Sequence, residues 1–257
     1  MKFVKIDPPG QFCTYEALRD AVKVRGGSTF LDVGCGAGTI SKLLCDEGCT
    51  GVGVDFSSEA IEIAKKTLAS EIAQGRYKLH HGDVHDLPAD FTKVDFAISY
   101  MVMEHVEDDI GFIRTIAQFV KPGGNIILGV PGRRDRWSIE DETVGHLRRY
   151  DRADLDAVLR KAGLNDVDVW SVAVPTANLL FNLGAWLVKN SDEVKKIGQS
   201  QREQTESSGI RDIPWKTTFP SWVKLILNRW SLWPLFVIQR RFYNTGLGVT
   251  MMGLGRV

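Results

Sequence analysis

The sequence predicts an α/β fold built around a mainly parallel sheet. Short apolar runs typical of buried strands alternate with segments of helical periodicity along the first part of the chain. Acidic residues and glycines directly follow several of these runs. Parallel strands joined by right-handed crossovers end at one edge of the sheet, and ligands bind at that edge. The pattern therefore predicts a binding site as well as a fold.

The expected elements divide the chain into four parts. Strands are expected at 29–33, 51–54, 77–80, 94–99, 125–130, 167–174 and 246–257. Helices are expected between them, and 122–124 (Pro-Gly-Gly) is a typical stop signal for a helix over about 106–120. The predicted organisation is an N-terminal helical cap at 1–27, a core at 28–174, a helical lid or insertion at 175–245 and a final strand at 246–257.

Composition argues against several classes of protein. The 257 residues include 32 basic and 32 acidic side chains, so the basic surplus usual in nucleic-acid-binding domains is missing. The four cysteines show no zinc-ligand spacing, so reduced thiols and no metal are expected. Residues 1–10 lack the apolar core of a signal peptide, and polar residues interrupt the uncharged stretch between 168 and 189. A cytoplasmic protein is expected.

A glycine-rich turn follows the first strand of the predicted core. Gly34, Gly36 and Gly38 come just after Asp32, and glycines allow positive φ and close approach of a ligand to the backbone. The helix that follows points free N–H groups at the turn, which favours an anion such as a pyrophosphate or an amino-acid carboxylate. The nicotinamide fingerprint G-x-G-x-x-G fits imperfectly, because Gly38 comes one residue early.

Two further carboxylates end the next two strands. Asp55 follows the second strand and can accept hydrogen bonds from ribose hydroxyls. Asp83 follows the third strand and could accept from an adenine amino group, while Val84 offers an apolar wall and a backbone N–H. Each acidic residue could instead cap a helix. Three carboxylates at successive strand ends nevertheless predict a site for an adenosine with a small charged tail.

These residues carry a resemblance to a known family. Residues 30–38 resemble motif I of the class I S-adenosylmethionine (SAM)-dependent methyltransferases, 54–57 resemble their acidic ribose position, and 82–84 their adenine position. Asp95 with 99–100, and 120–124, look like later motifs of the family. The resemblance covers about residues 28–170 and is strongest to the ubiquinone-biosynthesis-type and small-molecule branch. It implies SAM as cofactor and a Rossmann-like sheet of seven strands in the order 3-2-1-4-5-7-6, with strand 7 antiparallel.

Combining residues and resemblance gives a predicted cofactor site. Tyr100 follows the fourth strand, and the resemblance places 100–106 at the methionine end and the acceptor pocket. Tyr15, with Phe12, could close over the cofactor or simply pack in an N-terminal helix. The predicted cofactor-binding residues are Asp32, Gly34, Cys35, Gly36, Gly38, Asp55, Phe56, Asp83, Val84, Tyr100 and Tyr15.

Candidate catalytic residues follow the fourth and fifth strands. His105 is the first choice for a base, and Glu104 could orient it or bind a metal; packing at a helix start is the alternative for His105. The resemblance suggests that 146–150 roofs the acceptor pocket, where His146 and Tyr150 could touch the acceptor. Arg148 or Arg149 could hold an anionic group or form an ion pair with Asp151 or Asp154.

The sequence predicts methyl transfer to a small-molecule O, N or C acceptor, lipid-like or a natural product. The alternatives are a non-catalytic SAM-binding module and an NAD-dependent oxidoreductase. The motifs of nucleic-acid methyltransferases are absent. The acceptor and the oligomeric state are not predicted.

An aromatic and basic stretch at 219–242 could contact a membrane surface. Packing over the sheet edge or in a dimer is the favoured interpretation, since exposed apolar patches are usually covered. No binding to liposomes is therefore expected.

Overall fold

A computed structural model describes residues 3–88, 90–208, 213 and 215–257 of the chain. The predictions made for residues 1–2, 89, 209–212 and 214 lie outside the described residues. By their internal contacts, the residues form two compact units. Unit 1 comprises Met1–Arg19, Pro131–Arg152 and Trp170–Met251, and unit 2 comprises Asp20–Val130, Ala153–Val169 and Met252–Val257.

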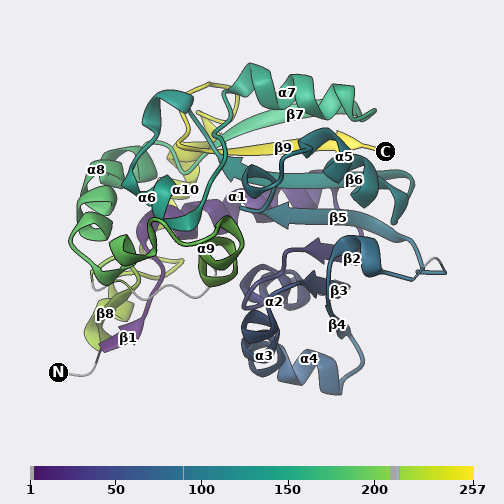
Figure 1. Ribbon diagram of the computed structural model, residues 1–257, viewed down its shortest axis with the longest axis horizontal. Coiled ribbons are helices and arrows are strands. Elements are labelled where there is room, and N and C mark those ends of the chain that lie inside the picture. The colour runs from purple at the N-terminus through teal and green to yellow at the C-terminus, as the bar shows by residue number, and fades with distance from the viewer. Residues whose placement is uncertain (1–2, 89, 209–212, 214) are drawn as a thin grey trace. The chain divides into compact units, whose positions relative to one another are not determined.

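A seven-stranded sheet has the order β4-β3-β2-β5-β6-β9-β7 (Figure 1). Its strands, in chain order, are β2 (Thr29–Val33), β3 (Thr50–Asp55), β4 (Tyr77–His81), β5 (Val94–Tyr100), β6 (Val120–Pro131), β7 (Asn165–Val172) and β9 (Thr250–Arg256). This is the predicted order 3-2-1-4-5-7-6. Strands β2 to β6 pair in parallel. Val257 bonds to Gly123 and Gly124 at the start of β6, while Val249 bonds to Gly132 after its end, so β9 runs antiparallel as predicted.

Helices separate the strands as the periodicity predicts. The helices are α1 (Pro9–Arg25), α2 (Thr39–Asp46), α3 (Ser58–Thr67), α4 (Ala69–Ala73), α5 (Asp109–Gln118), α6 (Ile139–Val144), α7 (Arg152–Lys161), α8 (Thr176–Lys189), α9 (Gln201–Ser208) and α10 (Trp233–Arg240). Ser57 caps α3 by accepting from the N–H of Ala60, and Asp108 caps α5 through Gly111. None of the described helices is long and apolar enough to span a bilayer.

Aromatic rings fill the centre of the sheet in unit 2. Phe30 of β2 lies between Phe96 of β5, at 5.8 Å between ring centroids, and Tyr77 of β4, at 6.1 Å. Gly51 of β3 leaves room for the Phe30 ring, which a Cβ would approach to 2.3 Å. These side chains are buried, and their packing fixes the register of the four strands whose carboxyl ends carry the predicted site.

Two parts of the fold differ from the sequence prediction. Strand β6 begins at Val120 rather than at 125, because Val94 pairs with Val120 before the register shifts at Phe96. The Pro-Gly-Gly segment at 122–124 thus lies inside a strand. In unit 1, β1 (Phe3–Lys5) and β8 (Thr218–Pro220) form a separate antiparallel pair that the sequence did not predict. Three-residue strands are too short to show a periodic pattern.

Candidate active site

The glycine turn has the backbone that its sequence requires. Gly34, Gly36 and Gly38 have φ of +74°, +53° and +80°, a left-handed conformation that favours glycine. The N–H groups of Gly34 and Cys35 donate to the carbonyl of Val54 at 2.8 and 3.1 Å, which joins the turn to β3. A Cβ on Gly36 would meet nothing within 4 Å. The backbone there faces open space, as a turn that receives a ligand needs.

Asp55 lies against this open turn. Its Oδ2 accepts from the N–H of Gly36 at 2.7 Å, and its Oδ1 accepts from the N–H of Ser57 at 2.8 Å. The carboxylate is therefore fixed between the glycine turn and the start of α3. The sequence predicted that Asp55 and the glycines converge, and the structure brings them together.

Asp32 has a different environment from the one expected. Its carboxyl is 2 % exposed and accepts from the hydroxyl of Ser41 at 2.6 Å. Ser41 in turn lies 2.6 Å from the hydroxyl of Tyr77. Burial raises the pKa of Asp32 to about 7, against the hydrogen bond from Ser41 and with help from the charge of Asp55. Asp32 thus supports the turn from the core, and its contact with the cofactor stays a prediction.

The neighbouring thiol is buried too. Cys35 is 7 % exposed, and burial raises the pKa of its thiol. A Cβ on Gly53 would approach its Sγ to 2.9 Å and the hydroxyl of Tyr77 to 2.0 Å. Only a glycine at 53 leaves space for both groups under the turn. The contact of Cys35 with the cofactor stays a prediction. Because the thiol is buried, the backbone of Cys35 would make that contact.

Asp83 lies at the adjacent strand end. Asp55 pairs with His81 in the sheet, and the N–H of Gly82 donates to the Asp55 carbonyl at 3.0 Å. The Asp83 side chain is 60 % exposed and caps the next turn by accepting from the N–H of His85 at 3.0 Å. Val84 beside it is buried. Asp83 thus serves as the cap that the sequence left open, while its adenine contact stays a prediction, as does that of the partly buried Phe56.

The segment after β5 contains the first candidate base. Tyr100 packs across Gly129, where a Cβ would meet its ring at 2.1 Å. Met101 then adopts φ +56°, and its N–H donates to the Gly129 carbonyl at 2.8 Å. In the short 3-10 turn Met103–His105, Glu104 is fully buried and His105 is partly exposed. The catalytic roles of these two residues stay predictions.

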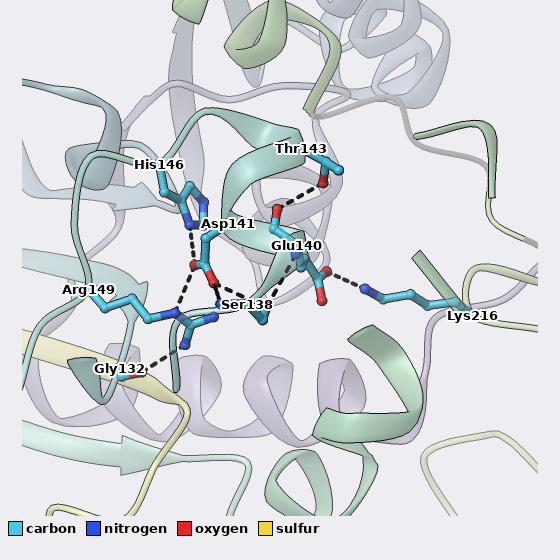
Figure 2. Close-up of polar contacts among 8 residues, drawn as sticks. All are labelled: Gly132, Ser138, Glu140, Asp141, Thr143, His146, Arg149 and Lys216. Carbon is cyan, nitrogen blue, oxygen red and sulfur yellow. Dashed lines mark hydrogen bonds and ion pairs between the residues drawn. The ribbon is translucent and has the colours of Figure 1, made fainter. Parts of the chain in front are cut away.

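Figure 2 shows a polar network in unit 1 around a buried carboxylate. Asp141 of α6 is fully buried, and its Oδ1 lies 2.8 Å from Nδ1 of His146 and 2.8 Å from Nε of Arg149. Its Oδ2 accepts from the N–H of Ser138 at 2.8 Å, which closes a capping box at the start of α6. A carboxylate only accepts, so His146 donates from Nδ1 and its ring is held in one orientation.

Arg149 and Tyr150 are buried in the same unit. Arg149 is 6 % exposed and donates to the carbonyl of Gly132 at 2.9 Å (Figure 2). Its guanidinium also lies over the ring of Phe181, at 5.4 Å from the centroid. Its partner is Asp141, neither of the aspartates expected from the sequence. Tyr150 is 2 % exposed and its N–H bonds to the carbonyl of Pro131; the contact of its ring with an acceptor stays a prediction.

The sequence analysis missed Asp141. The signal was present: Ser138 followed three residues later by an acidic residue is a capping box. Nothing in that spacing shows that the same carboxylate also binds His146. Tyr15 was predicted to close over the cofactor; its hydroxyl donates to Asp7 at 3.0 Å, and burial raises the pKa of Asp7. The closing role of Tyr15 stays a prediction.

Residues 13–169 of the chain match the family described as methyltransferase domain. Among curated proteins, the mitochondrial ubiquinone biosynthesis O-methyltransferase of Schizosaccharomyces pombe is 36% identical over 110 residues, 42% of this chain and 39% of that protein. The ubiquinone biosynthesis O-methyltransferase of Coxiella burnetii is 32% identical over 107 residues, 42% of this chain and 45% of that protein. The chain thus spans less than half the length of these relatives.

Solved structures share the fold. A SAM-dependent methyltransferase from Thermotoga maritima, described as a possible histamine N-methyltransferase, has a TM-score of 0.56 at 18% identity, covering 96% of this chain and 90% of that one. One from Thiobacillus denitrificans, in complex with S-adenosyl-L-homocysteine, has a TM-score of 0.53 at 20% identity, covering 98% and 93%. With the family match extending over more than half of the sequence, the chain belongs to the methyltransferase domain family and has the Rossmann-like fold of class I SAM-dependent methyltransferases.

Proposed function

We propose that this protein transfers the methyl group of SAM to a hydroxyl of a small-molecule acceptor. One observation carries the proposal: the Asp55 carboxylate is fixed 2.7 Å from the N–H of Gly36, beside a left-handed turn that opens onto free space. The names of the curated relatives, both ubiquinone O-methyltransferases, support oxygen as the attacking atom.

The residues of unit 2 suit the two ends of an adenosine. Asp55 would accept from the ribose hydroxyls, and Asp83, two residues past the paired strand, would accept from the adenine amino group. The N–H groups at the start of α2 would face the carboxylate of the amino-acid tail. SAM supplies a methyl that its sulfonium already activates. The chain's work is therefore mainly to align the donor with the acceptor.

A hydroxyl acceptor must lose its proton, and His146 is the base we propose. Asp141 holds the ring through Nδ1, so the neutral imidazole carries its proton there and Nε2 is its basic atom. The segment 132–150 follows β6 directly, and Tyr150 and Arg149 bind it to Pro131 and Gly132 at the strand's carboxyl end. That is the edge where ligands bind in such sheets. His105, oriented by Glu104, is the alternative base.

Calorimetry with S-adenosylhomocysteine tests the cofactor site. Asp55→Ala is expected to weaken binding by about 2–4 kcal/mol, because charge-assisted hydrogen bonds are lost. Asp55→Asn keeps one acceptor for the backbone and should lose less. Asp46→Ala, at an exposed acidic residue of α2, is the matched control and should bind like the wild type. Wild-type affinity in folded Asp55 variants would refute the site.

Turnover is measured as the formation of S-adenosylhomocysteine from SAM across a panel of hydroxyl-bearing acceptors. Release that depends on acceptor supports the proposal. Tight S-adenosylhomocysteine binding without turnover on any acceptor would favour the non-catalytic SAM-binding module instead.

A further inference from the structure

The stretch 222–233 of unit 1 exposes large apolar side chains close together in the chain. Trp222, Leu225, Ile226, Trp230 and Trp233 are 52%, 81%, 56%, 86% and 59% exposed. The sequence favoured packing for this region, as a cap on the sheet or in a dimer. Within the part of the chain that the structure describes, these five side chains remain open to solvent.

The stretch is held in place by its own hydrogen bonds. The side-chain oxygen of Asn228 accepts from the N–H groups of Trp230 and Ser231 at 3.0 and 3.1 Å, and its amide donates to the carbonyl of Leu225 at 2.9 Å. Asn228 thus closes a turn that presents Trp230. Local hydrogen bonds therefore define the conformation of this turn.

Buried neighbours anchor the same stretch. Leu232 and Phe236 pack with Cys13 of α1 and Ala173 in a core cluster of unit 1. Val223 is buried as well. The apolar residues therefore divide into some that anchor the stretch and others that project from it. Such a division is expected where an apolar surface has a partner of its own.

The charged residues of the segment that contains the stretch are all basic. From residue 213 to the end, the sequence has six basic side chains and no acidic one, which leaves 26 basic and 32 acidic residues in the rest of the chain. Lys224, Arg240 and Arg241 are exposed. Arg229 is paired with Glu16 of α1, its Nε lying 2.7 Å from the carboxylate, and so ties the stretch to that helix. A second copy of this positive surface would be repelled by the first.

We infer that the stretch 222–233 is a docking surface for an anionic lipid bilayer. Tryptophan is enriched at the interface between membrane and water, at the level of the lipid headgroups. Flanking Lys and Arg side chains are attracted to anionic lipids. Leu225 and Ile226 would enter the upper part of the acyl region. The contact would be peripheral, which agrees with the lack of a membrane-spanning helix among the described residues. It would also bring the protein to lipid-dissolved acceptors, although docking does not depend on that.

Co-sedimentation with vesicles tests the inference. The full chain is expected to bind vesicles of phosphatidylcholine and phosphatidylglycerol at low salt, and to bind pure phosphatidylcholine vesicles at least tenfold more weakly. Adding salt should reduce the difference. Lack of binding to the anionic vesicles, or equal binding to both kinds, would overturn the inference.

Paired variants separate the surface from general effects. Leu225→Ser with Trp230→Ser should weaken binding about tenfold, whereas Val24→Ser, at another exposed apolar residue (69%), should not. Lys224→Glu with Arg241→Glu should remove the preference for anionic vesicles, and Lys66→Glu on α3 should keep it. Light scattering that shows a dimer which Trp230→Ser dissociates would assign the surface to a second copy and refute the lipid.

Discussion

At the scale of single residues, Asp141 shows how hydrogen bonds stabilise a buried charge. Burial raises the pKa of Asp141, but hydrogen bonds from His146 and Arg149 outweigh burial and hold that pKa below its usual value. A buried carboxylate with a cationic partner on the same oxygen stays ionised. It can therefore keep His146 in one tautomer, which is a requirement for a base that acts through Nε2.

Variants of this pair separate catalysis from structure. His146→Gln is expected to lower kcat about 10²- to 10⁴-fold while S-adenosylhomocysteine affinity changes little, because the base acts on the acceptor only. Raising the pH should bring the variant closer to the wild type, since the acceptor then ionises without help. Asp141→Asn should also lower kcat, as an amide can hold the ring in the wrong tautomer. Lys66→Gln, at an exposed residue of α3, is the control, and an unchanged kcat in His146→Gln would transfer the role to His105.

At the scale of elements, hydrogen bonds that run from Asp32 through two hydroxyl groups link two strands and a helix. Asp32 belongs to β2, Ser41 to α2 and Tyr77 to β4, so one buried network supports the glycine turn from below. Its carboxyl has a pKa of about 7 in the folded protein and an ordinary value of 3.8. The folded state therefore keeps a proton that the unfolded state has lost between these two values.

The pH dependence follows from that difference. Below about pH 4 both states are protonated and Asp32 leaves stability unchanged; as pH rises to about 7 the folded state becomes less stable, and above that the cost is constant. Asp32→Asn can still accept from Ser41 but does not titrate. Relative to the wild type, its unfolding free energy should improve by on the order of a few kcal/mol between pH 4 and 8. Urea unfolding measures this. A difference that stays constant with pH would contradict the role.

Elements were the level that the sequence predicted best. The strands follow from apolar runs between helices, because periodicity is a local property, whereas their order was implied by the family resemblance. The contacts of Asp95 could not be predicted from local sequence patterns. It lies at the start of β5 and accepts from the N–H groups of Ser28 and Thr29, both at 2.9 Å, and from Lys121 at 2.6 Å. Asp95, which belongs to a segment that resembles a family motif, thus joins three strands at the end of the sheet opposite the predicted site.

The parts that could not be predicted depend on long-range contacts. The β1–β8 pair joins residues that are more than 200 apart in the sequence, and the exposure of Trp230 depends on which neighbours fold over it. Tertiary context decides such features, and no single window of sequence contains it.

At the scale of the whole molecule, the chain passes between the two units repeatedly. It crosses at 19–20, 130–131, 152–153, 169–170 and 251–252, and three of these points lie at or within strands β6, β7 and β9 of one sheet. Neither unit is a continuous piece of chain. Because three of the crossing points fall in strands of one sheet, a single cooperative unfolding transition is expected.

The seven tryptophans make this cooperativity measurable. All of them, from Trp137 to Trp233, belong to unit 1, whereas the glycine turn and Asp55 belong to unit 2. S-adenosylhomocysteine at about 100 times its Kd should stabilise the folded state by about 2.7 kcal/mol, which raises Tm by about 5–10 °C for a chain of this size. With a single unfolding transition, tryptophan fluorescence and far-ultraviolet circular dichroism should report the same rise. A rise in the dichroism midpoint alone would mean that the tryptophans do not take part in the transition that the ligand stabilises, and would contradict a single transition.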